Sequence, residues 1–99
     1  MHLLYLLTYD IDTTLDNGRR LQKVANVCKS YGQRVQDSVF ELNIDSVKMT
    51  ELKIQLEAVI DKQVDSVRIY KLGKYTKYDV CTIGKKEVVE LSDPGAIIL

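Results

Sequence analysis

The segment from Arg34 to Ile44 limits the folds open to this chain more than any other, because it can form one strand or two. Strict alternation of apolar and polar residues fails inside it. Val35 and Val39 share one face of an extended chain with Asp37, whereas the apolar residues after Val39 alternate on the other face. A β-bulge or a sharp bend near Asp37 and Ser38 would let Val35 and Phe40 both reach the core, and it would divide the segment into two short strands.

Hydrophobic periodicity predicts the elements on either side of this segment. Leu3 to Tyr9 is almost continuously apolar and stops at Asp10, as in a central strand buried on both faces. Apolar residues then recur at helical spacing, and Gly32 is expected to end this helix in a left-handed conformation. A second helix is predicted to open at Asp45, and the next strand covers Ser66 to Leu72. The residues predicted for the buried sides of the two helices are Leu21, Val24, Ala25, Cys28 and Tyr31, then Met49, Leu52, Leu56, Val59 and Ile60.

The order of these elements defines the fold class. With the bend, the order is β-α-β-β-α-β, the ferredoxin-like plan of an α+β sandwich, and without it one strand is missing. A chain of 99 residues is enough for one core, so residues 1–99 are predicted to form a single domain. A further short strand is predicted over Asp79 to Ile83. The apolar tail, residues 86–99, is expected to dock on a sheet edge, which in a small domain can belong to a partner subunit.

Charge and composition exclude several classes of protein. No apolar run approaches the ~20 residues of a membrane helix, and the start of the chain lacks the basic region and cleavage site of a secretory signal. Two cysteines make a disulfide framework improbable and favour a reducing, cytoplasmic compartment. The formal net charge is zero, yet the stretch from Asn17 to Gln36 holds five cations and no acid, namely Arg19, Arg20, Lys23, Lys29 and Arg34. Such a stretch is either a solvated helix face or a local positive potential that binds phosphates.

Asp10 is the residue best placed for chemistry. It ends a hydrophobic strand, and strand ends in layered α/β structures often carry sites. Mg²⁺ takes one or two carboxylates and keeps several waters, so Asp10 together with the loop carboxylates Asp12 and Asp16 is a candidate set of ligands. The alternative is an aspartate that caps a turn. Nucleophilic catalysis is disfavoured, because His2 is the only histidine and it has no triad-like neighbours.

A row of polar side chains follows Gly32. Arg34, Gln36 and Ser38 fall on one face of an extended chain, with Phe40 at the end of the row. A sheet that only needed a core would carry Val or Ile at these positions. The row therefore predicts a surface that meets a polar partner.

Three motifs now stand in order along the chain: Tyr9-Asp10-Ile11, then the block from Gly32 to Glu41, then Asp65-Ser66-Val67-Arg68-Ile69-Tyr70. Together they resemble the small CRISPR-associated endonuclease family of the adaptation module, the ferredoxin-like partner of the CRISPR spacer integrase. The resemblance runs to about Gly73. It implies a symmetric homodimer whose sheets pack face to face, with a pair of Asp10 carboxylates near the two-fold axis and a C-terminal strand that crosses to the partner subunit.

The resemblance also implies an activity and a partner. Family members are described as metal-dependent nucleases of double-stranded DNA or single-stranded RNA, with Asp10 here as the catalytic and metal-binding residue and Mg²⁺ or Mn²⁺ as the cofactor. The residues expected to contact nucleic acid are Arg19, Arg20, Lys23, Arg34, Ser38 and Phe40. The alternative is a non-catalytic, DNA-binding adaptor that bridges integrase dimers during spacer acquisition. The CRISPR subtype and the choice between DNA and RNA stay open.

Overall fold

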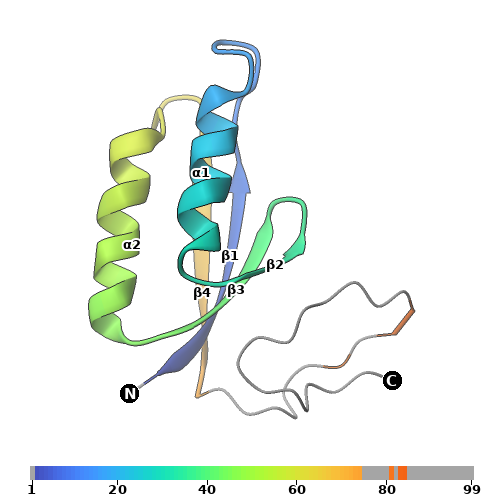
Figure 1. The fold of residues 1–99 in the computed structure, drawn as a ribbon, viewed down its shortest axis with the longest axis vertical. Coiled ribbons are helices and arrows are strands. Elements are labelled where there is room, and N and C mark those ends of the chain that lie inside the picture. The colour runs from blue at the N-terminus through green and yellow to red at the C-terminus, as the bar shows by residue number, and fades with distance from the viewer. Residues whose placement is uncertain (1, 75–80, 82, 85–99) are drawn as a thin grey trace.

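The computed structural model of this protein describes residues 2–74, 81, 83 and 84. Its elements follow the predicted order of strand, helix, two strands, helix and strand (Figure 1). They are β1 (Leu3–Asp10), α1 (Arg19–Lys29), β2 (Gln33–Gln36), β3 (Val39–Ile44), α2 (Ser46–Val59) and β4 (Ser66–Gly73). The predicted division of the segment between the helices into two strands is therefore confirmed.

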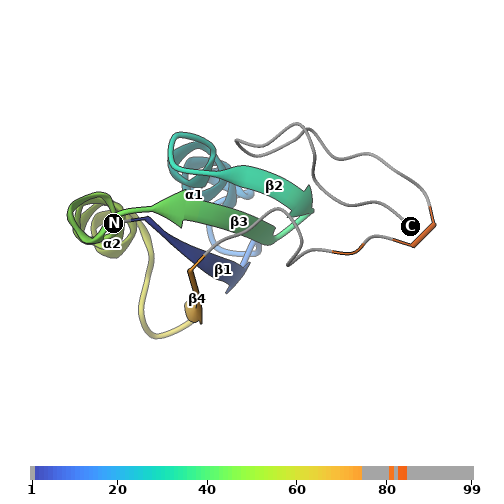
Figure 2. The same cartoon turned by 90° about the horizontal axis from the view of Figure 1, so that it is seen from below.

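The four strands form one antiparallel sheet in the order β2-β3-β1-β4, and both helices lie on the same side of it (Figure 2). This is the ferredoxin-like α+β fold. In the part of the chain that the structure describes, neither helix is long and apolar enough to cross a membrane.

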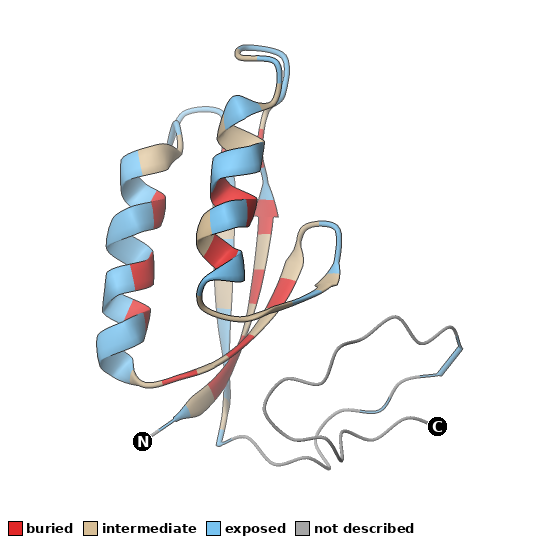
Figure 3. Cartoon of the chain, viewed as in Figure 1, coloured by how far each residue is buried: buried red, intermediate tan, exposed pale blue. Residues whose placement is uncertain are grey.

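The central strand β1 is covered by helices on one face alone. Its helix-facing side chains Tyr5, Leu7 and Tyr9 are buried, as the alternation of a strand requires (Figure 3). On the other face Leu4 is buried, but Leu6 and Thr8 are partly exposed and Asp10 is exposed. The prediction of burial on both faces thus holds only in part, because neither α1 nor α2 lies over that second face. We call it the open face.

The turn between β2 and β3 lies at Asp37 and Ser38, where the sequence predicted the bend, and a bulge in β2 comes in addition to it. A bulge at Val35 interrupts the register, so that Arg34 pairs with Phe40 while Gln36 pairs with Val39. Phe40 is fully buried, as predicted, but Val35 is only partly buried and does not belong to the core cluster. The extra residue also moves Gln36 off the face of Arg34, so the expected single row of polar side chains does not exist.

Asp45 begins α2 by accepting a hydrogen bond from the backbone N–H of Lys48 at 2.8 Å. Asp45 is the N-cap of this helix, and the sequence predicted that the helix opens at this residue. The helix buries Met49, Leu52 and Leu56 against the sheet, and α1 buries Val24, Ala25 and Cys28 in the same core. The side chains predicted at the helix ends, Leu21, Tyr31, Val59 and Ile60, are partly buried and pack against this core.

Gly32 lies between α1 and β2 and does not have the left-handed conformation that we predicted, since the glycines with positive φ are Gly18, Gly73 and Gly84. Its requirement is steric. A Cβ atom added at Gly32 would overlap the backbone carbonyl oxygen of Glu41 and a methyl group of Leu42. Glycine therefore lets the chain pass close to β3.

Gly32→Ala is expected to lower the midpoint of thermal unfolding by roughly 10 °C, because a backbone carbonyl cannot yield to the new methyl without moving β3. The measurement is a thermal melt followed by circular dichroism, with Gly73→Ala beside it. Gly73 has space for a Cβ and carries only the strain of a positive φ. Equal melting shifts for the two variants would contradict the steric explanation.

The remaining predictions concern the chain beyond β4. The tail of residues 86–99 lies outside the described residues, and so does most of the strand predicted over residues 79–83. Cys81 and Ile83 are described, and both are exposed rather than buried. Cys28 is buried, and both cysteines are free thiols.

Candidate active site

Asp10 is the last residue of β1, and its side chain is exposed. It pairs in register with Ser66, the first residue of β4. Because Tyr9 and Ile11 are buried in the core, alternation places Asp10 on the open face. There it continues the row formed by Leu6 and Thr8.

The first motif is held to the second through Tyr9. Its backbone N–H donates to the carbonyl of Ser38 at 3.1 Å, and its hydroxyl donates to the carbonyl of Asp37 at 3.1 Å. Its ring stacks on Phe40 with the centroids 6.1 Å apart. Three contacts from one residue fix the end of β1, and hence the backbone of Asp10, against the turn of the β2–β3 hairpin.

Arg34 completes this arrangement on the helix-facing side of the sheet. Its guanidinium carbon lies 5.3 Å from the centroid of the Phe40 ring, and Nη2 donates to the Tyr9 hydroxyl at 3.4 Å. A cation over an aromatic face is attracted by the ring quadrupole. Within one chain, Arg34 and Asp10 therefore lie on opposite faces of the sheet and do not form a single site.

Asp65, the first residue of the third motif, holds the loop that follows Asp10. Its carboxylate accepts hydrogen bonds from the backbone N–H groups of Asp12 at 2.9 Å and Asp61 at 2.8 Å. Arg20 donates to it from Nε at 2.8 Å, and the carboxylate side chain has no exposed surface. The hydrogen bond from Arg20 is the main cause that lowers the pKa of Asp65 to about 2, and the two backbone donors act in the same direction.

Arg20 is consequently a structural residue rather than a free phosphate ligand. Besides Asp65 it contacts the carboxylate of Asp16 at 3.1 Å and the backbone carbonyl of Asp12 at 3.2 Å. Its guanidinium is surrounded by acceptors from its own chain. The prediction that Arg20 contacts nucleic acid therefore does not fit this structure.

The loop aspartates are also used within the chain. Asp12 accepts from the backbone N–H of Thr14 at 2.7 Å and from its hydroxyl at 2.6 Å, bonds that lower the pKa of Asp12. Asp16 accepts from the backbone N–H of Arg20 at 3.0 Å, near the start of α1. Asp12 therefore stabilises a turn and Asp16 the start of a helix. This is the alternative to metal binding that the sequence analysis gave.

The other residues predicted to contact nucleic acid are found in different environments. Arg19 and Lys23 are exposed and lie four residues apart on α1, hence on one face of that helix. Ser38 is partly exposed in the hairpin turn. Phe40 has no exposed surface, so its ring packs the core and cannot touch a ligand; we correct that assignment.

The structural role of Asp65 was not predicted from the sequence. The signal was present, since an aspartate stood at the head of the third motif, directly before a strand. However, its partners Arg20 and Asp12 are 45 and 53 residues away in sequence. Nothing in the local pattern indicates a contact over that separation.

The residues of one chain supply an incomplete metal site. Among the described residues, no group of three or more histidine, cysteine or acidic side chains is close enough to hold a metal ion. Asp10 offers one exposed carboxylate, and no described side chain or backbone N–H donates a hydrogen bond to it. Mg²⁺ suits such a site, because it is commonly bound by one or two carboxylates, waters and substrate phosphates.

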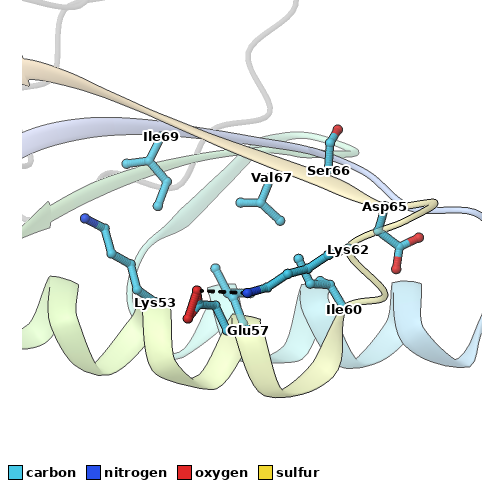
Figure 4. Close-up of a pocket in the computed structure, with 9 residues that line it drawn as sticks. Lys53, Glu57, Ile60, Lys62, Asp65, Ser66, Val67 and Ile69 are labelled. Carbon is cyan, nitrogen blue, oxygen red and sulfur yellow. Dashed lines mark hydrogen bonds and ion pairs between the residues drawn. The ribbon is translucent and has the colours of Figure 1, made fainter.

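A pocket of about 360 Å³ lies elsewhere, between α2 and β4 (Figure 4). It is lined by Leu56, Ile60, Val67 and Ile69, and Lys62 pairs with Glu57 at 3.5 Å beside it. Because Val67 and Ile69 face the helices, this pocket is on the side of the sheet opposite to Asp10. It shares Asp65 and Ser66 with the surroundings of the Asp10 site but does not include Asp10.

The fold and the site define a small ferredoxin-like domain that carries a strand-end carboxylate on the sheet face that neither helix covers. Comparison with known families identifies it further. The family described as CRISPR associated protein Cas2 matches residues 1–80. The chain belongs to this family.

Individual relatives agree along nearly the whole chain. The CRISPR-associated endonuclease Cas2 of Halalkalibacterium halodurans is 50% identical over 93 residues, which are 93% of this chain and 97% of that protein. The CRISPR-associated endoribonuclease Cas2 3 of Rhodospirillum rubrum is 47% identical over 90 residues, 90% of this chain and 95% of that protein. The crystal structure of Streptococcus pyogenes Cas2 superposes with a TM-score of 0.72 at 42% identity, covering 83% of this chain and all of that one.

Proposed function

We propose that this protein is a CRISPR-associated, metal-dependent endonuclease that cleaves phosphodiester bonds as a symmetric homodimer. The observation that carries the proposal is the exposed Asp10 carboxylate at the end of β1, in a chain whose relatives are named endonuclease and endoribonuclease. Both cysteines are free thiols, which fits a reducing, cytoplasmic location.

The open face is the proposed dimer surface. It is the side of the sheet that neither helix covers, and it presents the partly exposed apolar side chains Leu6 and Val39 on the face that carries Asp10. A two-fold axis through this face makes the same surface meet itself, so Asp10 of one copy can approach Asp10 of the other. The second copy then supplies the carboxylate that one chain lacks.

In this dimer the two Asp10 carboxylates would hold Mg²⁺ or Mn²⁺. When bound, such an ion polarises a phosphoryl oxygen and lowers the pKa of a bound water, so no nucleophilic side chain is needed. The chain's own contribution is placement: the contacts of Tyr9 and Asp65 fix the backbone on both sides of Asp10. Arg19, Lys23, Arg34 and Ser38 remain the proposed contacts to the nucleic-acid backbone.

The proposal is tested by cleavage assays on matched single-stranded RNA and double-stranded DNA. With Mg²⁺ or Mn²⁺ we expect shortened products from at least one substrate. After treatment with a chelator we expect none, and added Mg²⁺ should restore cleavage. Product formation that is unaffected by the chelator would contradict metal dependence, and no cleavage of either substrate with metal present would contradict the nuclease function itself.

A second function, the DNA-binding adaptor of the spacer integrase, is favoured by one observation. Arg19 and Lys23 form an exposed pair of cations on α1, and neither is neutralised by a carboxylate of the described residues. Reversing both charges to Glu should weaken DNA binding and reduce the dependence of affinity on salt. An unchanged salt dependence would remove the support for this role.

A further inference from the structure

The third motif contains an arginine, Arg68, that has no role in the proposed function. Arg68 lies on β4, directly opposite Thr8 and two pairs away from Asp10 and Ser66. Its neighbours Val67 and Ile69 pack against the core on the helix side. Arg68 is therefore on the open face, the face that carries Asp10.

Arg68 also keeps its charge available. It is exposed, and the contact found for its guanidinium among the described residues is a hydrogen bond from Nη1 to the Tyr70 hydroxyl at 3.3 Å. No described carboxylate lies within ion-pair distance of it, in contrast to Arg20. A guanidinium has five N–H donors, so the described residues leave most of them available for a ligand.

Neighbouring strands bring Arg68 within reach of the Asp10 site. Diagonal neighbours on one sheet face have Cβ atoms about 7–8 Å apart, a gap that an extended arginine spans. A phosphate placed against Asp10 through a metal ion would thus lie within reach of Arg68. Guanidinium is also the side chain that best matches a phosphate, because it donates two parallel hydrogen bonds.

We propose that Arg68 is a further catalytic residue of the Asp10 site, where it binds the scissile phosphate and stabilises the negative charge that develops on it during cleavage. The proposal rests on the nuclease function proposed above. Tyr70, whose hydroxyl accepts from Arg68, would hold the guanidinium in place along the strand.

Among the described residues, a competing partner for Arg68 lies on the open face. Glu41 of β3 lies on the same face, opposite Leu6, and it is partly buried. In a face-to-face dimer, Arg68 of one copy could pair with Glu41 of the other and hold the dimer together without touching substrate. That role and the catalytic role predict different results when Arg68 is replaced.

The experiment compares Arg68→Gln with Lys71→Gln, a matched control. Lys71 is exposed on the same strand but pairs with Tyr5, which faces the helices. Steady-state cleavage of the better substrate gives kcat and KM, and light scattering gives the mass of each variant in solution. For Arg68→Gln we expect a dimer whose kcat is about 10²-fold lower, while Lys71→Gln matches the parent protein. Guanidinium ion at millimolar concentration should partly restore cleavage by Arg68→Ala.

Binding to a labelled oligonucleotide in the absence of metal distinguishes failure of the Arg68 proposal from failure of the nuclease function. We expect Arg68→Gln to bind more weakly. The slope of log affinity against log salt concentration should also fall by about the contribution of one phosphate contact. If the parent protein does not cleave, the nuclease function fails, and this measurement still decides whether Arg68 meets nucleic acid. The proposal is overturned if Arg68→Gln dissociates into monomers, or if it cleaves and binds as Lys71→Gln does.

Discussion

Asp10→Asn is expected to reduce phosphodiester cleavage by about 10³-fold or more while leaving a folded protein of unchanged mass. Asn keeps the size of the side chain and removes the negative charge that would hold the metal ion. The cost in stability should be small, because Asp10 is exposed and accepts no hydrogen bond from the described residues. The measurements are single-turnover cleavage with Mg²⁺, a thermal melt, and the mass in solution.

Asp12→Asn is the matched control for this substitution. It removes a carboxylate two residues further along the chain, where an amide oxygen can still accept the hydrogen bonds from Thr14. We expect Asp12→Asn to cleave as the parent protein does. Equal loss in the two variants would mean that net charge in the loop, rather than Asp10, controls the reaction, and equal activity of Asp10→Asn and parent would refute the assigned role.

Much of the fold was accessible from local patterns. The helical spacing of apolar residues predicted which sides of α1 and α2 are buried, and Asp45 before the second helix predicted its N-cap. The failure of alternation near Asp37 and Ser38 predicted two strands where a simpler pattern gives one, and the turn lies at these residues. These features depend on residues within a few positions of one another, which is the range over which sequence patterns are informative.

The details of the site could not be predicted from local sequence patterns. The bulge at Val35 puts Arg34 and Gln36 on different faces, and a simple count of alternation cannot locate the extra residue. Arg20 was predicted as a phosphate ligand because it stands in a cationic stretch. Its acceptor at position 65 comes close only when the sheet and helix assemble.

The two groups of contacts around Asp10 suit a strand end that must be rigid. On one side Tyr9 is held to the hairpin of β2 and β3, and on the other Asp65 holds the N–H of Asp12. Exposed strand ends and loops are the parts of a domain that open with the lowest free energy. Fixing both sides keeps an exposed carboxylate in one position without burying it.

Asp65→Asn is expected to lower the thermal midpoint by roughly 10–20 °C at neutral pH. Each described group that hydrogen-bonds to this carboxylate is a donor: the backbone N–H groups of Asp12 and Asp61, and the guanidinium of Arg20. The amide of Asn would turn an N–H₂ toward one of these donors, and the ion pair would be lost. The control is Asp45→Asn, since asparagine caps a helix about as well as aspartate and the melt should barely change.

The same substitution has a pH dependence of known sign. The folded state lowers the pKa of Asp65 from the usual 3.8 to about 2, so the stabilisation by its charge is complete above pH 3.8 and is lost as the pH falls toward 2. The difference in thermal midpoint between the parent protein and Asp65→Asn should therefore shrink across this window. A difference that stays constant down to pH 2 would show that Asp65 acts by shape alone. Amide hydrogen exchange should locate the loss, with Asp12 and Asp61 exchanging faster in the variant at neutral pH, because these two N–H groups lose the acceptor that fixes the loop behind Asp10.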